Sequence, residues 1–147
     1  MIRLAEKSDL PGLLELERRA FPKDHFTRAQ LLHLLTRASG IFLVDAMFQT
    51  STIRASAILL FRKNSGTARL YSIGVHPDYQ ARGLARRLLR RCEILARLRR
   101  CRTMALEVRE ENRAARRLYE SVGYVIRGRI PEYYSDGAAA ITYEKQL

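Results

Sequence analysis

The sequence is poor in the residues that build disulfide scaffolds, metal centres and membrane spans. Among its 147 residues are only two cysteines, Cys92 and Cys101, which form no Cys-x-x-Cys pair, so we expect buried reduced thiols. The three histidines lie far apart without metal-ligand spacing, so no metal site is predicted. No run of about eighteen apolar residues occurs and the start does not resemble a signal peptide, which predicts a soluble, cytoplasmic protein without a membrane partner.

Acidic residues are also scarce. The 15 aspartates and glutamates are outnumbered by 27 lysines and arginines, which gives a net charge of +12 and favours anionic partners. Nine arginines lie between Arg82 and Arg102, and several of them share one helical face. Glu93 stands at helical spacing from Arg90 and Arg97 and can pair with both. This face is either a solvated, partly paired surface or a site for a phosphate-rich cofactor or a ribosomal surface.

The order of hydrophobic patterns and turn signals predicts an α/β protein in one domain, residues 1–147. We expect strands at Ile2–Ala5, Ile41–Val44, Ala55–Arg62, Ala68–Val75, Thr103–Val108, Tyr124–Arg129 and Ala138–Lys145. We expect helices from Ser8-Asp9 to Ala20, from a Thr27 cap to near Gly40, over Leu84–Arg99, and from Asn112 to a Gly123 cap. The pattern therefore predicts a mixed, mostly antiparallel, twisted sheet of about seven strands with four helices on both faces.

A glycine loop, IGVHPDYQARGLAR at Ile73–Arg86, joins a strand to the arginine-rich helix. It lacks the Gly-Lys-Ser/Thr of a Walker loop and the three spaced glycines of a dinucleotide fingerprint. The first amides of a helix have no partners within the helix and carry the positive end of its dipole, so the junction suits an anionic ligand. Gly83 would let the backbone approach a phosphate closely. An ordinary strand-to-helix turn is the alternative.

Three side chains after this helix have types that suit proton transfer and ligand contact. Strand alternation places Glu107 near the end of Thr103–Val108, opposite in face to Leu106 and Val108. Asn112 and Tyr119 are seven residues apart, almost two helical turns, and so share a face of the fourth helix. Each has a plainer explanation, because Glu107 can pair with an arginine, Asn112 can cap the helix and Tyr119 can belong to the core.

Together, IGVHPDYQARGLARRLL and LEVREENRAARRLYESVGY resemble the GCN5-related N-acetyltransferase (GNAT) superfamily, and within it the RimI-like, ribosomal-protein alanine N-acetyltransferase type. The resemblance covers the chain in element order, and Ile73–Tyr124 carries its specific part. Ala85 replaces the commoner third glycine of the loop, and the sequence contains no tryptophan. These departures leave the acceptor unassigned.

The resemblance implies the GNAT fold and transfer of the acetyl group of acetyl-CoA to an amine. It implies that the donor contacts Ile73, Gly74, Val75, Gln80, Ala81, Arg82, Gly83, Leu84, Ala85, Arg86 and Asn112. The backbone amides from Ala81 to Arg86 would bind the pyrophosphate, and the strand edge at residues 73–75 would pair with the pantetheine arm. Glu107 would be the general base and Tyr119 the general acid for the departing thiolate, while the Val75 amide polarises the carbonyl.

The acceptor is expected to be an α-amine. At neutral pH about a tenth of α-amines are unprotonated, against under about a thousandth of lysine side chains. Glu132, Tyr133 and Tyr134 resemble the segment that such enzymes place over a peptide acceptor, and Phe21–Thr27 is expected to form the other wall. A protein N-terminus, for example of a ribosomal protein, is thus the first hypothesis, for a monomer or dimer. The alternatives are acetylation of a small amine (polyamine, amino acid or aminoglycoside), and a non-catalytic module that senses acetyl-CoA or binds RNA or the ribosome.

Overall fold

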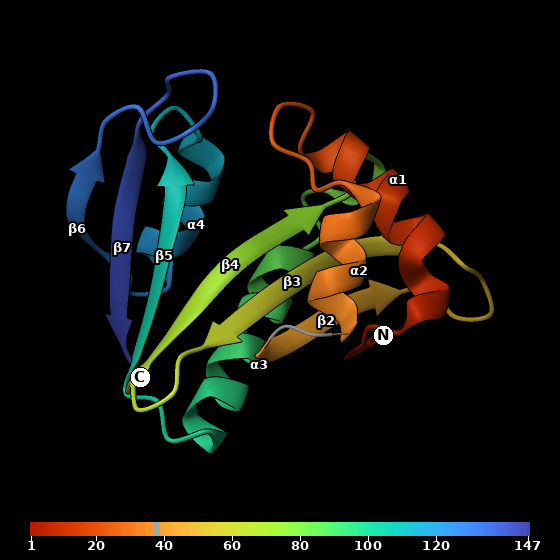
Figure 1. Cartoon of the computed structure of the whole chain (residues 1–147), viewed down its shortest axis with the longest axis horizontal. Helices are drawn as coiled ribbons and strands as arrows, with labels where there is room; N and C mark the ends of the chain where they lie inside the picture. Colours follow the sequence, from red (N-terminus) through yellow and green to blue (C-terminus); the bar gives the residue numbers. More distant parts are fainter. Residues whose placement is uncertain (37–38) are drawn as a thin grey trace.

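The computed structural model describes residues 1–36 and 39–147 and contains one seven-stranded sheet. In the order β1-β2-β3-β4-β5-β7-β6, all neighbours are antiparallel except β4 and β5, which are parallel. The strands are β1 (Ile2–Leu4), β2 (Gly40–Ala46), β3 (Ile53–Phe61), β4 (Thr67–Val75), β5 (Thr103–Arg109), β6 (Val125–Ile130) and β7 (Ala140–Gln146). The mixed, mostly antiparallel sheet predicted from the sequence is confirmed (Figure 1).

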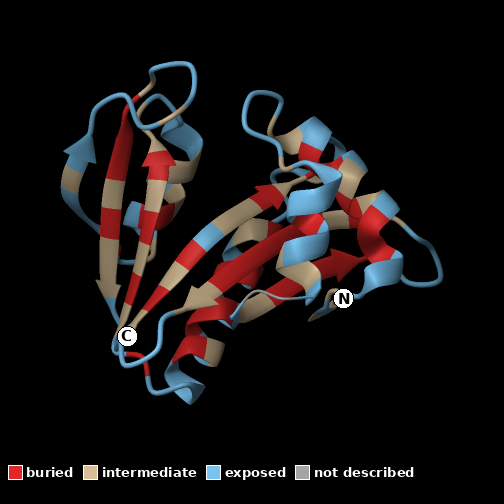
Figure 2. Cartoon of the chain, in the orientation of Figure 1, coloured by how far each residue is buried: buried red, intermediate tan, exposed pale blue. Residues whose placement is uncertain are grey.

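Four helices cover the two faces of the sheet: α1 (Leu10–Ala20), α2 (Arg28–Thr36), α3 (Leu84–Leu98) and α4 (Arg113–Ser121). α1 and α2 lie on one face of the sheet, while α3 and α4 lie behind it (Figure 1). Each layer encloses its own apolar cluster, with Leu13 and Leu16 against Val44 on one side and Leu88 and Leu89 in the cluster on the other. The central strands are therefore buried on both faces (Figure 2).

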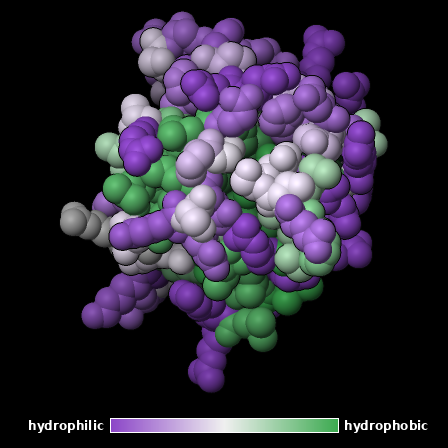
Figure 3. Space-filling model, turned by 90° about the vertical axis from the view of Figure 1, so that its right-hand side faces the viewer, coloured by the Kyte–Doolittle hydropathy of each residue, from purple (hydrophilic) through white to green (hydrophobic). Residues whose placement is uncertain are grey.

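The outer surface is largely polar. Seen from the right-hand side of Figure 1, polar side chains cover most of the surface, and apolar side chains show between them (Figure 3). No helix in the part of the chain that the structure describes is both long and apolar enough to cross a membrane.

Local sequence signals explain the start of α2 but not the capping of α1 or the end of α2. Thr27 caps α2 as predicted, because its Oγ1 accepts the Gln30 amide at 3.2 Å while the Gln30 side chain accepts the Thr27 amide. α1 begins differently, because Asp9 binds Arg3 through two 2.8 Å hydrogen bonds instead of capping the helix. The predicted end of the second helix near Gly40 is wrong, since Gly40 already pairs with Leu60 in the sheet; residues 37–38 lie outside the described part.

The two parallel strands separate halfway along their length. β4 pairs with β5 only between Thr67–Leu70 and Thr103–Leu106, although β4 stays paired with β3 as far as Val75. The two strands therefore diverge like the arms of a V (Figure 1). The amide of His76 donates to the carbonyl of Arg54 in β3, so strand alternation turns the backbone groups of Val75 toward the gap. The V thus exposes a strand edge to any ligand within it.

Glu93 does not pair with Arg90 and Arg97, which corrects the prediction for the α3 face. Its side chain is buried and accepts hydrogen bonds from the Tyr124 hydroxyl at 2.9 Å and from Lys145 Nζ at 3.1 Å. One turn away on each side lie Leu89 and Ala96, so Glu93 belongs to the buried stripe of α3. Arg90 and Arg97 lie about one turn from Glu93, at the edge of this stripe, and remain exposed.

Candidate active site

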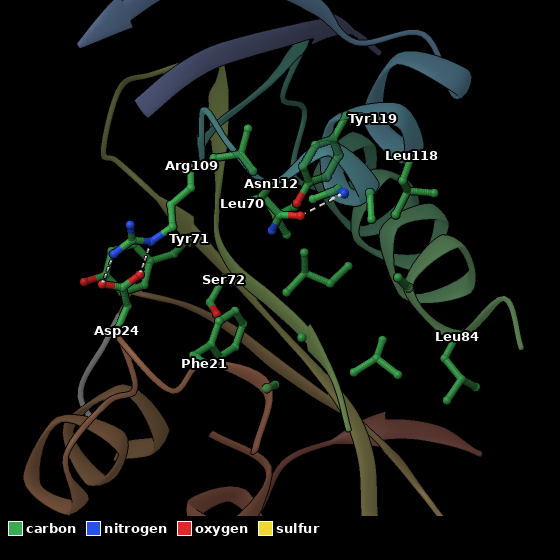
Figure 4. Close-up of a pocket in the computed structure, with 18 of the residues that line it drawn as sticks. Phe21, Asp24, Leu70, Tyr71, Ser72, Leu84, Arg109, Asn112, Leu118 and Tyr119 are labelled. Atoms are coloured by element: carbon green, nitrogen blue, oxygen red, sulfur yellow. Dashed lines mark hydrogen bonds and ion pairs between the residues drawn. The ribbon is translucent and has the colours of Figure 1, made fainter. Parts of the chain in front are cut away.

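A cavity of about 920 Å³ fills the gap between the diverging strands. This volume is ample for a cofactor-sized ligand. Segments from both arms of the V line it. These are the end of α1 with the loop after it, β4 from Arg69 to Val75, the glycine loop, the end of β5, α4 and the tyrosines of the β6–β7 loop. Figure 4 shows how their side chains surround the open space.

The glycine loop ends in a backbone arrangement that presents amides to the cavity. Gly83 is the N-cap of α3 with φ +76°, a left-handed conformation that strains any residue with a Cβ. Ala81 also has a positive φ, +61°. The first helical hydrogen bond runs from the Arg87 amide to the Gly83 carbonyl, so the amides of Leu84–Arg86 precede it. Unpaired amides at the positive end of a helix suit an anionic group such as a phosphate.

Gly74 lets the end of α1 pack closely against β4 beside the cavity. A Cβ added at Gly74 would lie 2.5 Å from Cε2 of Phe21, so the glycine lets the end of α1 approach the strand closely. Ile73, Gly74 and Val75 all line the cavity. An extended ligand arm can therefore lie along this edge and bond to the backbone groups that face the gap.

Tyr119 enters the cavity from α4. Its side chain is buried, its ring contacts those of Tyr124 and Tyr143, and burial raises the pKa of its hydroxyl. Within the described residues this hydroxyl forms no hydrogen bond, and no fully buried side-chain oxygen or nitrogen there lacks a partner. The hydroxyl therefore reaches the cavity, into which it points (Figure 4). Asn112 lies beside it as the N-cap of α4, with its Oδ1 accepting the Ala115 amide at 3.2 Å. The ring of Tyr119 thus packs in the core, while its hydroxyl is free to donate a proton or hydrogen bond to a ligand in the cavity.

Glu107 lines the same cavity and forms an ion pair with Arg69. Arg69 Nη2 lies 3.1 Å from Oε1 of Glu107, and Arg69 Nε donates to Oε2 at 3.2 Å. The same guanidinium donates to the Tyr133 hydroxyl at 3.2 Å and lies 5.2 Å from the ring centre of Tyr71. The carboxylate is therefore held in position, while about a quarter of its side chain, 23%, stays exposed.

Nearly all predicted site residues meet around this cavity. Glu107, Tyr119, Tyr133 and Tyr134 line it, and so do the predicted donor contacts Ile73, Gly74, Val75, Gln80, Ala81, Gly83, Leu84, Ala85, Arg86 and Asn112. Arg82 and Glu132 do not: the guanidinium of Arg82 lies over the Tyr79 ring, 5.3 Å from its centre. The expected wall at Phe21–Thr27 also contributes, through Phe21, Asp24 and Phe26.

Sequence reasoning missed three charged residues of the lining, Glu17, Arg69 and Arg109. Arg69 and Arg109 contact predicted site residues, and Asp24 binds Arg109. Glu17 is buried on α1 and accepts the Phe26 amide at 3.0 Å; burial raises the pKa of its carboxyl. Glu17 had a visible signal, a carboxyl on the apolar stripe of an amphipathic helix. The others depend on contacts between segments far apart in the sequence.

Comparison with known proteins places these features in a family. A sequence model described as the acetyltransferase (GNAT) family matches residues 10–124. The [ribosomal protein bS18]-alanine N-acetyltransferase of Escherichia coli K12 is 36% identical over 121 residues, which span 81% of this chain and 76% of that protein. The crystal structure of the E. coli ribosomal-protein-S18-alanine N-acetyltransferase superposes with a TM-score of 0.87 at 29% identity, covering 100% of this chain and 93% of that one.

A third likeness concerns the fold alone. The crystal structure of the NatC complex bound to Gag peptide and CoA gives a TM-score of 0.83 at 18% identity, covering 100% of this chain and 98% of that chain. The family match spans most of the 147 residues and includes the glycine loop, Glu107 and Tyr119. Enzymes of this family transfer the acetyl group of acetyl-CoA to an amine. The chain therefore belongs to the GNAT family and is an acetyl-CoA-dependent N-acetyltransferase.

Proposed function

We propose that this enzyme acetylates the α-amine of a protein N-terminus. The observation that carries the proposal is the arrangement of Glu107 beneath two tyrosines of the β6–β7 loop, with Arg69 joining the carboxylate to the Tyr133 hydroxyl. Tyrosine hydroxyls can bond to a peptide backbone, and a nearby carboxylate can take a proton from the amine at the start of that peptide. The likeness to enzymes named for acetylating an alanine of bS18 supports the same acceptor class.

The proposed roles follow from the chemistry of each group. Glu107 removes a proton from the acceptor ammonium, directly or through water, so that the amine attacks the thioester carbonyl. The backbone amide of Val75, which faces the gap, stabilises the negative charge that develops on the carbonyl oxygen. Tyr119 donates a hydrogen bond to the departing sulfur. The loop from Gln80 to Arg86 binds the diphosphate, while Asn112 and the edge of β4 hold the pantetheine arm.

The charge of the cavity favours an α-amine over a polyamine or an aminoglycoside. Three acidic residues in the lining, Glu17, Asp24 and Glu107, are balanced by three basic ones, Arg69, Arg86 and Arg109. A polycation binds best where negative charge is in excess. An α-amine needs no such excess, because about a tenth of it is already neutral at pH 7.

The basic face of α3 supports a second candidate function, binding of RNA or of the ribosome. Because Glu93 turns inward, the exposed arginines there lack the partner expected from the sequence. An RNA- or ribosome-binding module would use this face and would bind nucleic acid without acetyl-CoA, with strong salt dependence. A cytoplasmic location, a single-domain organisation and a monomeric or dimeric state remain predictions.

A thiol-release assay with acetyl-CoA tests the acceptor class. The panel contains peptides that begin with Ala, Ser or Met, the same peptides with a blocked N-terminus and one internal lysine, and spermidine. We expect release of CoA with the free N-termini and none with the blocked peptides, which serve as matched controls. Turnover of spermidine alone would refute the proposal in favour of a small amine. Salt-sensitive RNA binding that does not require acetyl-CoA would support the second candidate.

A further inference from the structure

The groups proposed to react stand on opposite arms of the V. Val75 belongs to the arm formed by β1–β4, whereas Glu107 and Tyr119 belong to the arm formed by β5–β7 and α4. Direct β4–β5 hydrogen bonding ends at Leu70 and Leu106, near the vertex. The distance between the reacting groups therefore depends on whatever joins the arms toward the open end.

Arg109, the last residue of β5, makes such a connection. Its Nε donates to Oδ2 of Asp24 at 2.6 Å and its Nη2 donates to Oδ1 at 2.9 Å, a bidentate pair across the V (Figure 4). Its Nη1 contacts Asp136 at 3.1 Å and Glu111 at 3.1 Å on its own arm. The hydrogen bond to Asp24 is the main reason that the pKa of Arg109 is raised. One guanidinium thus binds three carboxylates, and Asp24 is the one on the opposite arm.

The guanidinium of Arg109 also contacts the β6–β7 loop, which is proposed to bind the acceptor. Arg109 lies 4.4 Å from the centre of the Tyr134 ring, and the Tyr133 and Tyr134 rings contact edge-on at 5.0 Å between centres. Asp24 belongs to the α1–α2 loop, which forms the facing wall of the cavity. The only other described ion pair between these two loops is the exposed contact of Lys23 with Asp136 at 3.8 Å. The Arg109–Asp24 pair, at 2.6 Å, is therefore the shorter of the two described ion pairs that join the α1–α2 loop to the opposite arm.

We propose that Arg109 and Asp24 form an electrostatic latch that joins the two arms of the V and fixes the walls of the acceptor site. The inference rests on the proposed function, since it concerns the acceptor end of the same cavity. Arg109 acts here as a positioning residue, through Tyr134 and the two loops. Within the described residues, no hydrogen bond, ion pair or ring contact joins Arg109 to the glycine loop at Gln80–Arg86. Loss of the latch therefore weakens use of the acceptor and spares binding of acetyl-CoA.

Asp24→Asn and Glu111→Gln form a matched pair of variants. Each removes one charge that contacts Arg109, but only Asp24 lies on the opposite arm, whereas Glu111 is two residues away along the chain. For Asp24→Asn we expect about a tenfold higher KM for the acceptor peptide, the equivalent of one charge-assisted hydrogen bond, with an unchanged dissociation constant for acetyl-CoA. For Glu111→Gln we expect both constants to stay within about twofold of wild type.

Hydrogen exchange of the acetyl-CoA complex tests the latch without any acceptor. In Asp24→Asn, amides of both 21–27 and 131–139 should exchange faster together, whereas in Glu111→Gln they should exchange as in wild type. Faster exchange in 21–27 alone would overturn the proposal, as would an equal effect of the two variants on KM or weakened acetyl-CoA binding. If wild type turns over no peptide, the acceptor proposal fails, and the exchange measurement still decides on the latch.

Discussion

Replacement of Tyr119 by Phe tests the proposed acid at the level of a single oxygen atom. The ring is buried against Tyr124 and Tyr143, and Phe keeps those contacts. The hydroxyl has no hydrogen-bond partner among the described residues, so its removal leaves no buried group unsatisfied. We therefore expect the free energy of unfolding to change by less than about 1 kcal/mol. Any large loss of activity then reflects the missing proton donor.

The magnitude of that loss follows from the two proton affinities. Burial raises the pKa of Tyr119, whereas a thiol has an ordinary pKa of about 8.5. Full proton transfer from this phenol to a free thiolate is therefore uphill, and its main contribution is a hydrogen bond to the charge developing on sulfur. Such a bond to a charged group is worth about 1.5–3 kcal/mol. We expect kcat to fall about 10- to 150-fold, with the dissociation constant of acetyl-CoA unchanged.

Thiol release under saturating acetyl-CoA, with isothermal titration for the dissociation constant, measures both quantities. Because its pKa is raised, Tyr119 stays protonated through neutral and mildly alkaline pH, so ionisation of this hydroxyl should not lower kcat over that range. Wild-type turnover in Tyr119→Phe would remove this residue as the donor. A fall in stability that matches the fall in kcat would show that its role is structural.

Three further substitutions test the surrounding fold. Gly83→Val forces a β-branched residue into φ +76°, so titration should show at least about tenfold weaker binding of acetyl-CoA. Gly66→Val is the control, because Gly66 lies in an open turn without a positive φ, and this variant should bind acetyl-CoA as wild type does. Lys145→Met leaves the buried Glu93 carboxylate without its cation and should cost about 3 kcal/mol in urea unfolding. Glu93→Leu added to it should recover only part of the loss, because the buried Tyr124 hydroxyl then lacks its acceptor. Hydrogen bonds from Arg3 hold the pKa of Asp9 below its usual value of about 3.9. The ionised Asp9 therefore stabilises the fold above that pH, and this contribution is lost as the pH falls through the lowered pKa. The difference in unfolding free energy between wild type and Asp9→Asn should shrink over that range.

Local patterns predicted the parts of the fold that local energetics decide. The Thr27 cap, the start of α3 at Leu84 and the strands on either side of α3 all depend on neighbouring residues, and the structure contains each of them. Glu93 shows where this reasoning ends. Arg90 and Arg97 stand at pairing distance along the helix, but the Glu93 side chain is buried and pairs with Lys145, which lies 52 residues away along the chain. Sequence spacing alone gives no account of which face of α3 meets the sheet.

The candidate site was predictable where a motif carries it and hidden where the sheet topology creates it. Glu107, Asn112 and Tyr119 stand at motif spacing, and all three line the cavity. Arg69 had no such signal. Its contact with Glu107 joins residues 38 positions apart, and it arises only because β4 and β5 lie side by side in the folded sheet. The link between Arg109 and Asp24 spans 85 positions and requires the V itself.

The splitting of β4 from β5 explains why the chemistry gathers at this one place. Each strand keeps a partner on its outer side, β3 for β4 and β7 for β5, so the two can separate without exposing either strand fully. Beyond Leu70 the edge of β4 that faces β5 has no strand partner. A ligand that supplies the missing hydrogen bonds to these backbone groups therefore binds with a favourable free energy. The arms must nevertheless stay at a fixed distance for reaction. Arg69 near the vertex and Arg109 near the mouth satisfy that need with ion pairs, which hold the walls at defined positions while leaving the space between them open.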